Sequence, residues 1–120
     1  MNIANATILM LYALGMSLGQ VLFKIAANRA KARAADGFLE SLVTDGYFIL
    51  AVAIYGALTL VWVWILMRVP LSRAYPFLVL AFVFTPAFAV LFFDELVNIW
   101  YFTGLAFILV GLGILVWKVN

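Results

Sequence analysis

The chain has 120 residues, of which 69% are hydrophobic and 10% are charged. A soluble domain carries about 45–50% apolar and about 25% charged residues, and so short a chain cannot bury this surplus in a core of its own. The composition therefore excludes a free-standing soluble globule. The chain also has no cysteine and no histidine, which excludes a disulfide framework, a thiolate nucleophile and the commonest general base and metal ligand.

Four charge-free stretches of 20 to 23 residues divide the sequence: 1–23, 46–67, 74–93 and 96–117. An α-helix of about 20 residues crosses the roughly 30 Å hydrocarbon layer of a bilayer, whereas membrane barrels need an alternation of polar and apolar residues that is absent here. The sequence predicts an all-α integral membrane protein, a single four-transmembrane-helix bundle over 1–120 with both termini on the same side. The predicted helices cover about 3–27, 46–67, 71–93 and 97–119.

The longest polar segment, residues 28–45, joins the first two predicted helices. Its second half places Phe38, Leu39, Leu42 and Val43 on one helical face. This spacing fits a short amphipathic helix that lies in the membrane interface. A loop helix that packs its apolar face on the bundle fits it equally well.

Glycines mark a face on each of two predicted helices. Gly15 and Gly19 form a small-xxx-small pair in the first helix, which lets another helix approach closely. Gly104 and Gly111 are seven residues apart in the last helix and share one face. We interpret that second face as a helix-packing or dimer seam.

Three prolines lie in or next to the third predicted helix. Pro70 suits its start, and Pro76 falls in the first turn or two, where we expect little effect. Pro86 removes an internal hydrogen bond and should bend the helix.

The cations divide almost evenly between the two predicted sides of the membrane. The terminal side holds Arg68, Arg73 and Lys118. The other side holds Arg29, Lys31 and Arg33, together with Lys24 if its side chain extends outward. The positive-inside rule therefore gives almost no preference for one orientation. Insertion in both orientations stays open, and it would allow an antiparallel homodimer.

Lys24 is the most informative candidate for a binding site. Gln20 lies four residues before it and Ser17 seven residues before it, so the three side chains share a helix face. A cation and an amide inside a membrane bundle point to a cavity that binds an anion or hydroxyl groups. The simpler alternative is that Lys24 only extends to the lipid headgroups.

Arg73 and Tyr75, at the start of the third helix, form a second candidate. The arginine fork suits phosphate, and the free amides of a first helical turn would add to the affinity for an anion. The alternative is that Arg73 anchors the span at the interface.

Two neighbouring carboxylates, Asp94 and Glu95, close the third helix. Adjacent side chains point in different directions, which argues against the carboxylate pair of a hydrolase. We expect one of them to cap the last helix or to pair with Arg29, Lys31 or Arg33.

The sequence offers no catalytic site. It has no phosphate-binding glycine loop, no metal-ligand cluster and no pair of nucleophile and base. We therefore expect no enzymatic activity, no metal or other cofactor, and no nucleic-acid partner. The residues favour binding or movement of a substrate over its transformation.

Several motifs together resemble the small multidrug resistance-like branch of the drug/metabolite transporter (EamA-type) superfamily. They are GQxxxK at 19–24, VPxxxAYPxLxLxFV at 69–83, a following acidic residue at Glu95 and a glycine-bearing last helix. Within that superfamily, the chain most resembles the paired ArnE and ArnF subunits that flip undecaprenyl-phosphate-aminoarabinose. The resemblance implies a multi-pass protein of the bacterial inner (plasma) membrane, a lipid-linked sugar as substrate, and a homodimer or a heterodimer with a second small subunit.

One position departs from the drug exporters that this superfamily contains. Those proton-coupled proteins carry a membrane glutamate eight residues before the equivalent of Lys24, and here that position is Met16. The resemblance therefore disfavours proton-coupled export of cations.

We expect a small transporter or flippase for a polyprenyl-phosphate-linked sugar or a similar anionic glycolipid. The expected substrate-binding residues are Ser17, Gln20, Lys24, Arg73, Tyr75 and Glu95. Lys24 and Arg73 would attract the phosphate, while Gln20 and Tyr75 would bind the sugar and the lipid tail would remain among membrane lipids. The alternatives are a small-molecule or drug exporter of the same superfamily and a non-transporting membrane subunit of a glycosyltransferase complex.

Overall fold

The structure is a computed structural model that describes the backbone of residues 2–119 and the side chains of residues 2–117. All regular elements in that part of the chain are helical, which confirms the predicted all-α fold. The elements are α1 (Ile3–Ala32), the 3₁₀ helix η1 (Ala34–Asp36), α2 (Phe38–Val43), α3 (Gly46–Leu66), α4 (Leu71–Ala74), the 3₁₀ helix η2 (Tyr75–Leu80), α5 (Ala81–Phe93) and α6 (Ile99–Val119). The side chain of Lys118, which we expected on the terminal side, lies outside the described part.

Four helical segments are long and apolar enough to cross a membrane, as predicted. They are Ile3–Ala32, Gly46–Leu66, Leu71–Phe93 and Ile99–Trp117. The third segment is composite, because α4, η2 and α5 follow one another without a break.

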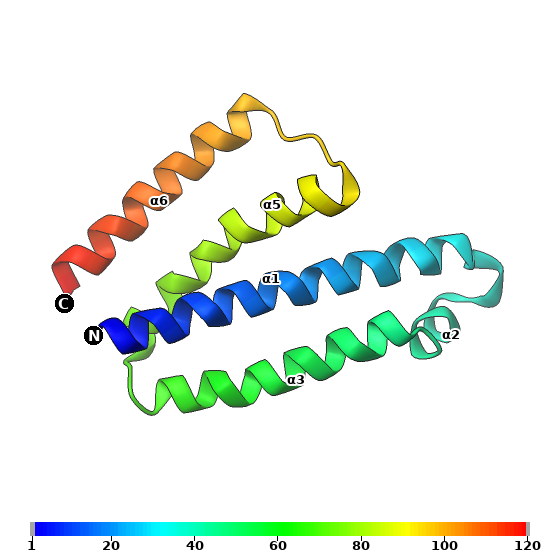
Figure 1. The fold of residues 1–120 in the computed structure, drawn as a ribbon, viewed down its shortest axis with the longest axis horizontal. Helices are drawn as coiled ribbons and strands as arrows, with labels where there is room; N and C mark the ends of the chain where they lie inside the picture. Colours follow the sequence, from blue (N-terminus) through cyan, green and yellow to red (C-terminus); the bar gives the residue numbers. More distant parts are fainter. Residues whose placement is uncertain (1, 120) are drawn as a thin grey trace.

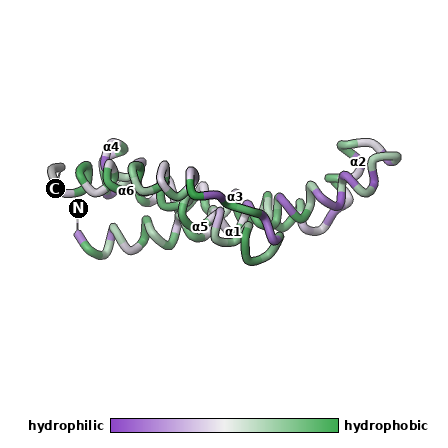
Figure 2. The backbone as a smooth tube through the Cα atoms, turned by 90° about the horizontal axis from the view of Figure 1, so that it is seen from above, coloured by the Kyte–Doolittle hydropathy of each residue, from purple (hydrophilic) through white to green (hydrophobic). Residues whose placement is uncertain are grey.

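In Figure 1, α3, α1, α5 and α6 follow one another across the molecule, and α4 and η2 cross α1 at the end that holds both termini. The view in Figure 2 shows that the molecule is flat. The chain extends over 53 × 37 × 18 Å. α1 contacts α3 on one side and η2 and α5 on the other, whereas α6 contacts η2 and α4. Both termini lie at one end of the molecule, which we call the terminal end, and α2 lies at the opposite, far end (Figure 1).

α1 is longer than the predicted 3–27. It begins after Asn2, whose side-chain oxygen accepts a hydrogen bond from the Asn5 amide at 2.8 Å, and it continues to Ala32. Arg29 and Lys31 lie in its last turn, where cations are favourable because of the helix dipole. The start of the predicted polar loop, residues 28–32, is therefore helical.

The third segment changes its helix type around Pro76, where we expected little effect. Residues Tyr75–Leu80 form a 3₁₀ helix, while the segment around Pro86 remains α-helical. Pro86 has no amide hydrogen for the carbonyl of Phe82, four residues earlier. The hydroxyl of Tyr101 donates a hydrogen bond to this carbonyl at 3.1 Å, so a side chain of α6 replaces the missing bond.

The buried core lies at the terminal end, where α1, α3, α4 and η2 meet. It consists of Leu9, Ile65, Val69, Ala74 and Phe77. Among the described side chains of α6, only Leu112 is buried. α6 is thus most closely packed in its C-terminal half, whereas its N-terminal half diverges from α5 (Figure 1) and is held by the hydrogen bond of Tyr101.

Helix α2 presents apolar side chains away from the protein. Phe38, Leu39 and Val43 are 71%, 72% and 59% exposed. The opposite face carries the buried Ser41, whose hydroxyl donates to the carbonyl oxygens of Gly37 and Arg33 at 2.7 and 3.1 Å. This arrangement favours the interfacial helix over a helix that packs its apolar face on the bundle.

Candidate functional site

A groove runs between α1, α5 and the start of α6. It comprises three adjoining cavities of about 210, 270 and 430 Å³, all of which Thr85 lines. We call it the α1–α5 groove. Its polar and charged lining residues are Gln20, Lys24, Thr85, Glu95, Asn98 and Tyr101. Gln20, Lys24 and Glu95 are exposed in the isolated chain, so the groove is open to its surroundings.

The packing of α1 against α3 sets one wall of this groove. The amide of Gln20 donates a hydrogen bond to the hydroxyl of Tyr55 at 2.6 Å, and that hydroxyl donates to the carbonyl of Met16 at 3.0 Å. The ring of Tyr55 lies directly over Gly19, where a Cβ atom would collide with it. The small-xxx-small pair therefore does allow a close approach, and the approaching group is the Tyr55 ring.

Lys24 lies deeper along α1 than the predicted helix boundary implied. Arg29 lies level with the start of α3, because it pairs with Asp45, the residue before Gly46. Lys24 is five residues, or about 7–8 Å, inside that level. It lines the 210 Å³ cavity together with Gln20 and Glu95. The structure thus brings together three of the six expected substrate-binding residues.

The chain path after α5 places Glu95 in the groove. α5 ends at Phe93, and Asp94 adopts a left-handed conformation with φ 52°. The backbone amide of Glu95 then donates to the carbonyl of Ala89 at 3.3 Å. The connection to α6 therefore lies beside the body of α1 and does not reach its far end (Figure 1).

Neither carboxylate at the end of α5 has the role that we expected. Asn98 caps α6, because its side-chain oxygen accepts the amide of Tyr101 at 3.0 Å. Arg29 pairs with Asp45 at 2.7 Å, and Arg33 pairs with Asp36 at 3.3 Å. Among the described residues, Asp94 and Glu95 have no side-chain hydrogen bond or ion pair. The expectation that one of them caps the last helix or pairs with the basic loop is wrong, because nearer partners occupy both places.

The pairing with Arg29 sets the protonation of Asp45, whose side chain is almost completely buried. Burial alone would raise the pKa of this carboxyl. Hydrogen bonds from Arg29 and from the backbone amides of Tyr47 and Phe48, together with the charge of Arg29, outweigh burial and hold the pKa below its ordinary value. This ion pair joins the far ends of α1 and α3.

Ser17 is fully buried behind the groove. Its hydroxyl donates to the carbonyl of Ala13 at 3.1 Å and accepts a hydrogen bond from Thr85 at 3.0 Å. It shares a helix face with Gln20, as predicted, but its polar atoms are used within the protein. In this structure Ser17 joins α1 to α5.

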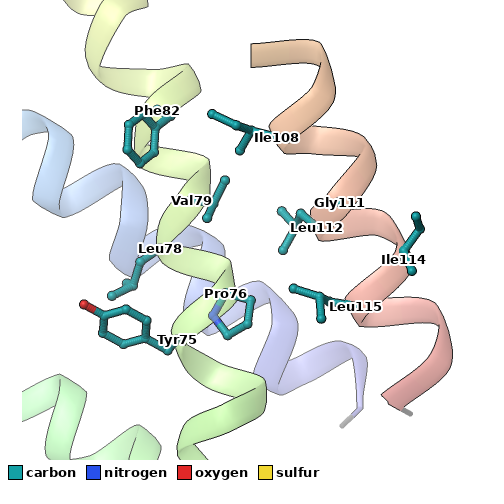
Figure 3. A pocket seen from close by; sticks show the side chains of 10 residues that line it. All are labelled: Tyr75, Pro76, Leu78, Val79, Phe82, Ile108, Gly111, Leu112, Ile114 and Leu115. Carbon is teal, nitrogen blue, oxygen red and sulfur yellow. The ribbon is translucent and has the colours of Figure 1, made fainter. Parts of the chain in front are cut away.

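Arg73 and Tyr75 lie at the terminal end, on the opposite half of the molecule from Lys24. The ring of Tyr75 contacts Trp62 edge-on, with the centroids 6.3 Å apart. Tyr75 also borders an apolar cavity of about 620 Å³ between η2 and α6. In that cavity, Pro76 and Val79 face side chains of α6 across an open space (Figure 3).

Three residues that shape the groove carry no direct signal in the sequence. Tyr55 and Tyr101 each supply a hydroxyl from a neighbouring helix, and Thr85 lies directly before a proline. A carbonyl freed by Pro86 must find another donor inside a membrane. That requirement predicts a donor near Phe82, although it does not identify Tyr101.

Comparison with known proteins gives one consistent group of relatives. No family model matches the chain, and no solved structure does. A probable 4-amino-4-deoxy-L-arabinose-phosphoundecaprenol flippase subunit ArnE from Pseudomonas aeruginosa strain LESB58 is 33% identical over 111 residues, which cover 92% of this chain and 96% of the relative. The equivalent subunit of Pseudomonas paraeruginosa strain DSM 24068 / PA7 is 32% identical over the same shares. These relatives are named as flippase subunits and not as enzymes. A 33% identity across nearly the whole of both chains, together with four apolar spans, shows that the chain belongs to the ArnE family of small multidrug resistance-like membrane proteins.

Proposed function

We propose that this chain is a subunit of a bacterial inner-membrane flippase for a polyprenyl-phosphate-linked amino sugar. The observation that carries the proposal is the position of Lys24 and Gln20 in one open groove inside the membrane-spanning part of α1. Similarity to ArnE subunits supports the lipid-linked sugar as substrate.

The charge of Lys24 is the reason to expect an anion in the α1–α5 groove. A cation within a membrane-spanning segment is costly unless it pairs with another group. Lys24 has no side-chain hydrogen bond or ion pair among the described residues. A lipid phosphate would supply the missing anion, while Gln20 would bind sugar hydroxyls and the apolar tail would stay in the bilayer.

Arg73 and Tyr75 would form a second station for the headgroup. They lie in α4 and at the start of η2, at the terminal end, whereas Lys24 lies in the far half of α1. The headgroup would pass from one cation to the other during transport. In an antiparallel dimer, Arg73 of one chain would instead approach Lys24 of the other.

A second small subunit or a second copy would complete the transport path. At Gly104 and Gly111 of α6, a Cβ would meet no described atom within 4 Å apart from the glycine's own helical surroundings, and Gly111 borders the open cavity between η2 and α6, so no helix of the described chain packs closely on the seam predicted here. Close packing of another helix on this face would supply the opposite wall of the path.

Replacing Lys24 tests the proposed function. We expect Lys24→Met to reduce flipping of a short-chain polyprenyl-phosphate-linked aminopentose at least about tenfold, because a buried charge pair typically contributes several kcal/mol. The measurement is transport in vesicles reconstituted with the purified complex. Lys31→Met is the matched control, since Lys31 lies in the last turn of α1 and does not line the groove. Wild-type flipping in the Lys24 variant would refute the assignment.

Export of a small organic cation is the second candidate, and Glu95 in the groove is the observation that favours it. Met16 lines the same groove without a carboxylate. Cation export predicts that vesicles containing the protein transport a cationic dye in response to a proton gradient. Flipping of the phosphate-linked lipid without such coupling supports the flippase.

A further inference from the structure

Two side chains of opposite charge line a single cavity of the α1–α5 groove. Lys24 enters it from α1, and Glu95 enters it from the connection between α5 and α6. No other charged side chain of the described residues lines the three cavities of the groove. The remaining lining is largely apolar, and Val21, Ala89 and Phe93 border the same cavity.

These two charges do not neutralise each other in this structure. No ion pair within 4.0 Å joins them in the described part of the chain, and neither side chain has another polar partner there. Unpaired charges next to apolar walls are costly in a membrane. A ligand that carries both an anion and a cation would satisfy both side chains at once.

We propose that Glu95 is the specificity-determining residue of the groove and binds a protonated amine on the headgroup while Lys24 binds the phosphate. This inference rests on the proposed function and specifies it further. The site would then select a zwitterionic headgroup, with one phosphate and one primary amine, over an anionic headgroup without an amine. A primary amine is largely protonated at neutral pH, so its charge is available to the carboxylate.

The local backbone explains why Glu95 takes this role and Asp94 does not. Asp94 occupies the left-handed position that ends α5, and it does not line any of the three cavities. The left-handed residue turns the chain, and the next side chain enters the groove. Asp94 therefore provides a neighbouring carboxylate that differs from Glu95 mainly in direction.

A headgroup whose amine is converted to an uncharged amide should bind poorly, because Glu95 would then lose its partner. An N-acetylated headgroup keeps the phosphate for Lys24 but leaves Glu95 buried by the ligand and unpaired. Sites built to bind a polar group reject analogues that lack it, because the protein group then loses its partner. The same argument predicts that neutralising Glu95 removes the discrimination and leaves phosphate binding intact.

The experiment compares two probes on the detergent-purified complex: a short-chain prenyl-phosphate-linked aminopentose and its N-acetyl derivative. We expect the wild type to bind the amine probe at least about tenfold more tightly. Glu95→Gln should weaken binding of the amine probe and should not weaken binding of the acetylated probe, which should tighten because no carboxylate is left unpaired, so that the two probes bind with similar affinity. Asp94→Asn is the matched control and should keep the preference.

The outcomes separate this inference from the proposed function. Equal affinity of the wild type for both probes, or equal weakening of both by Glu95→Gln, overturns the role of Glu95 while Lys24-dependent binding still supports the flippase. Failure of the wild type to bind either probe overturns the flippase itself.

A structural role for Glu95 predicts a different result. If Glu95 only stabilises Lys24, Glu95→Gln should lower the Tm of the ligand-free protein, and adding Lys24→Met should restore it. This result overturns the inference. If Glu95→Gln does not fold, the two probes on the wild type and on Glu95→Asp, which should retain the preference, decide the question.

Discussion

The α1–α3 pair and the α5–α6 pair differ in how their helices are held together, although all four segments have the length and apolar character of membrane spans. α1 and α3 are joined along their length, from the core at Leu9 and Ile65 through Tyr55 to the Arg29–Asp45 ion pair. α5 and α6 are linked by the hydrogen bond from Tyr101, near the start of α6, to Phe82, near the start of α5, and α6 otherwise packs on η2 and α4.

The α1–α3 pair therefore acts as a rigid scaffold, whereas the α5–α6 pair presents an open surface. Helices in a bilayer gain little from the hydrophobic effect when they associate, so close packing and hydrogen bonds hold them together. The α1–α3 pair has both and fixes the position of Lys24. The α5–α6 pair leaves the groove and a glycine face open, as the proposed binding of a substrate and of a second subunit requires.

Gly19→Ala should have the largest effect on the scaffold. The new Cβ would collide with the ring of Tyr55, and overpacking of this kind costs about 1–3 kcal/mol. The measurement is thermal unfolding in detergent. Gly56→Ala is the control, because its Cβ meets nothing within 4 Å and alanine favours a helix, so stability should stay the same or rise slightly. Equal loss in both variants would contradict the close approach.

Asp45→Asn should weaken the far end of the scaffold in a pH-dependent way. The folded-state pKa of Asp45 lies below its ordinary value, so its charge stabilises the fold above about pH 4 and this contribution is lost as the pH falls further. The variant should have a lower Tm than the wild type at pH 7, and the difference should shrink below about pH 4. A difference that does not change with pH would show that the charge is not responsible.

Tyr55→Phe should have a smaller effect, of about 0.6 kcal/mol, which is typical of a hydrogen bond between membrane helices. It removes the bonds to Gln20 and Met16 but keeps the ring over Gly19. Unfolding measurements on Tyr55→Phe and Gly19→Ala together would divide the stability of the scaffold into packing and hydrogen bonding. If Tyr55→Phe lost as much stability as Gly19→Ala, the hydrogen bonds of the hydroxyl, and not the packing of the ring on Gly19, would hold the two helices together.

Gly104→Leu should leave the stability of the single chain nearly unchanged. Gly104 is exposed, and apart from its own helical surroundings no described atom lies within 4 Å of its Cβ position. The larger side chain should nevertheless reduce association with a second subunit, which native mass spectrometry or cross-linking measures. An unchanged complex would remove this face of α6 from the interface.

The four spans could be predicted from the sequence because charges are excluded from the hydrocarbon layer, and charge-free lengths therefore report them directly. The sequence does not predict that α1 continues to Ala32, because a basic, alanine-rich segment can be helical outside the membrane as well as inside it. Lys24 and Glu95 line one cavity because of which helices are neighbours and how far each helix is shifted along the other. The resemblance included Glu95, but no spacing in the sequence places it beside Lys24.

Ser17 and Gln20 also show what the sequence of a single helix cannot predict. The helical repeat correctly places Ser17, Gln20 and Lys24 on one face, but it does not tell which of them a neighbouring helix covers. Thr85 covers Ser17, and Tyr55 holds Gln20 from the side. Both contacts depend on interhelical register, which periodicity within one helix does not contain.

The flat shape of the chain has a consequence for the proposed passage of a charged headgroup. A flat wall would shield the headgroup from hydrocarbon on one side only, and exposing a phosphate to lipid on the other side is costly. For the proposed flippase, the barrier to flipping would therefore depend on a second wall as much as on Lys24, and this chain would supply only one of the two walls. We expect substitutions on the two walls to compensate one another, so that a residue lost from this chain can be replaced from across the gap.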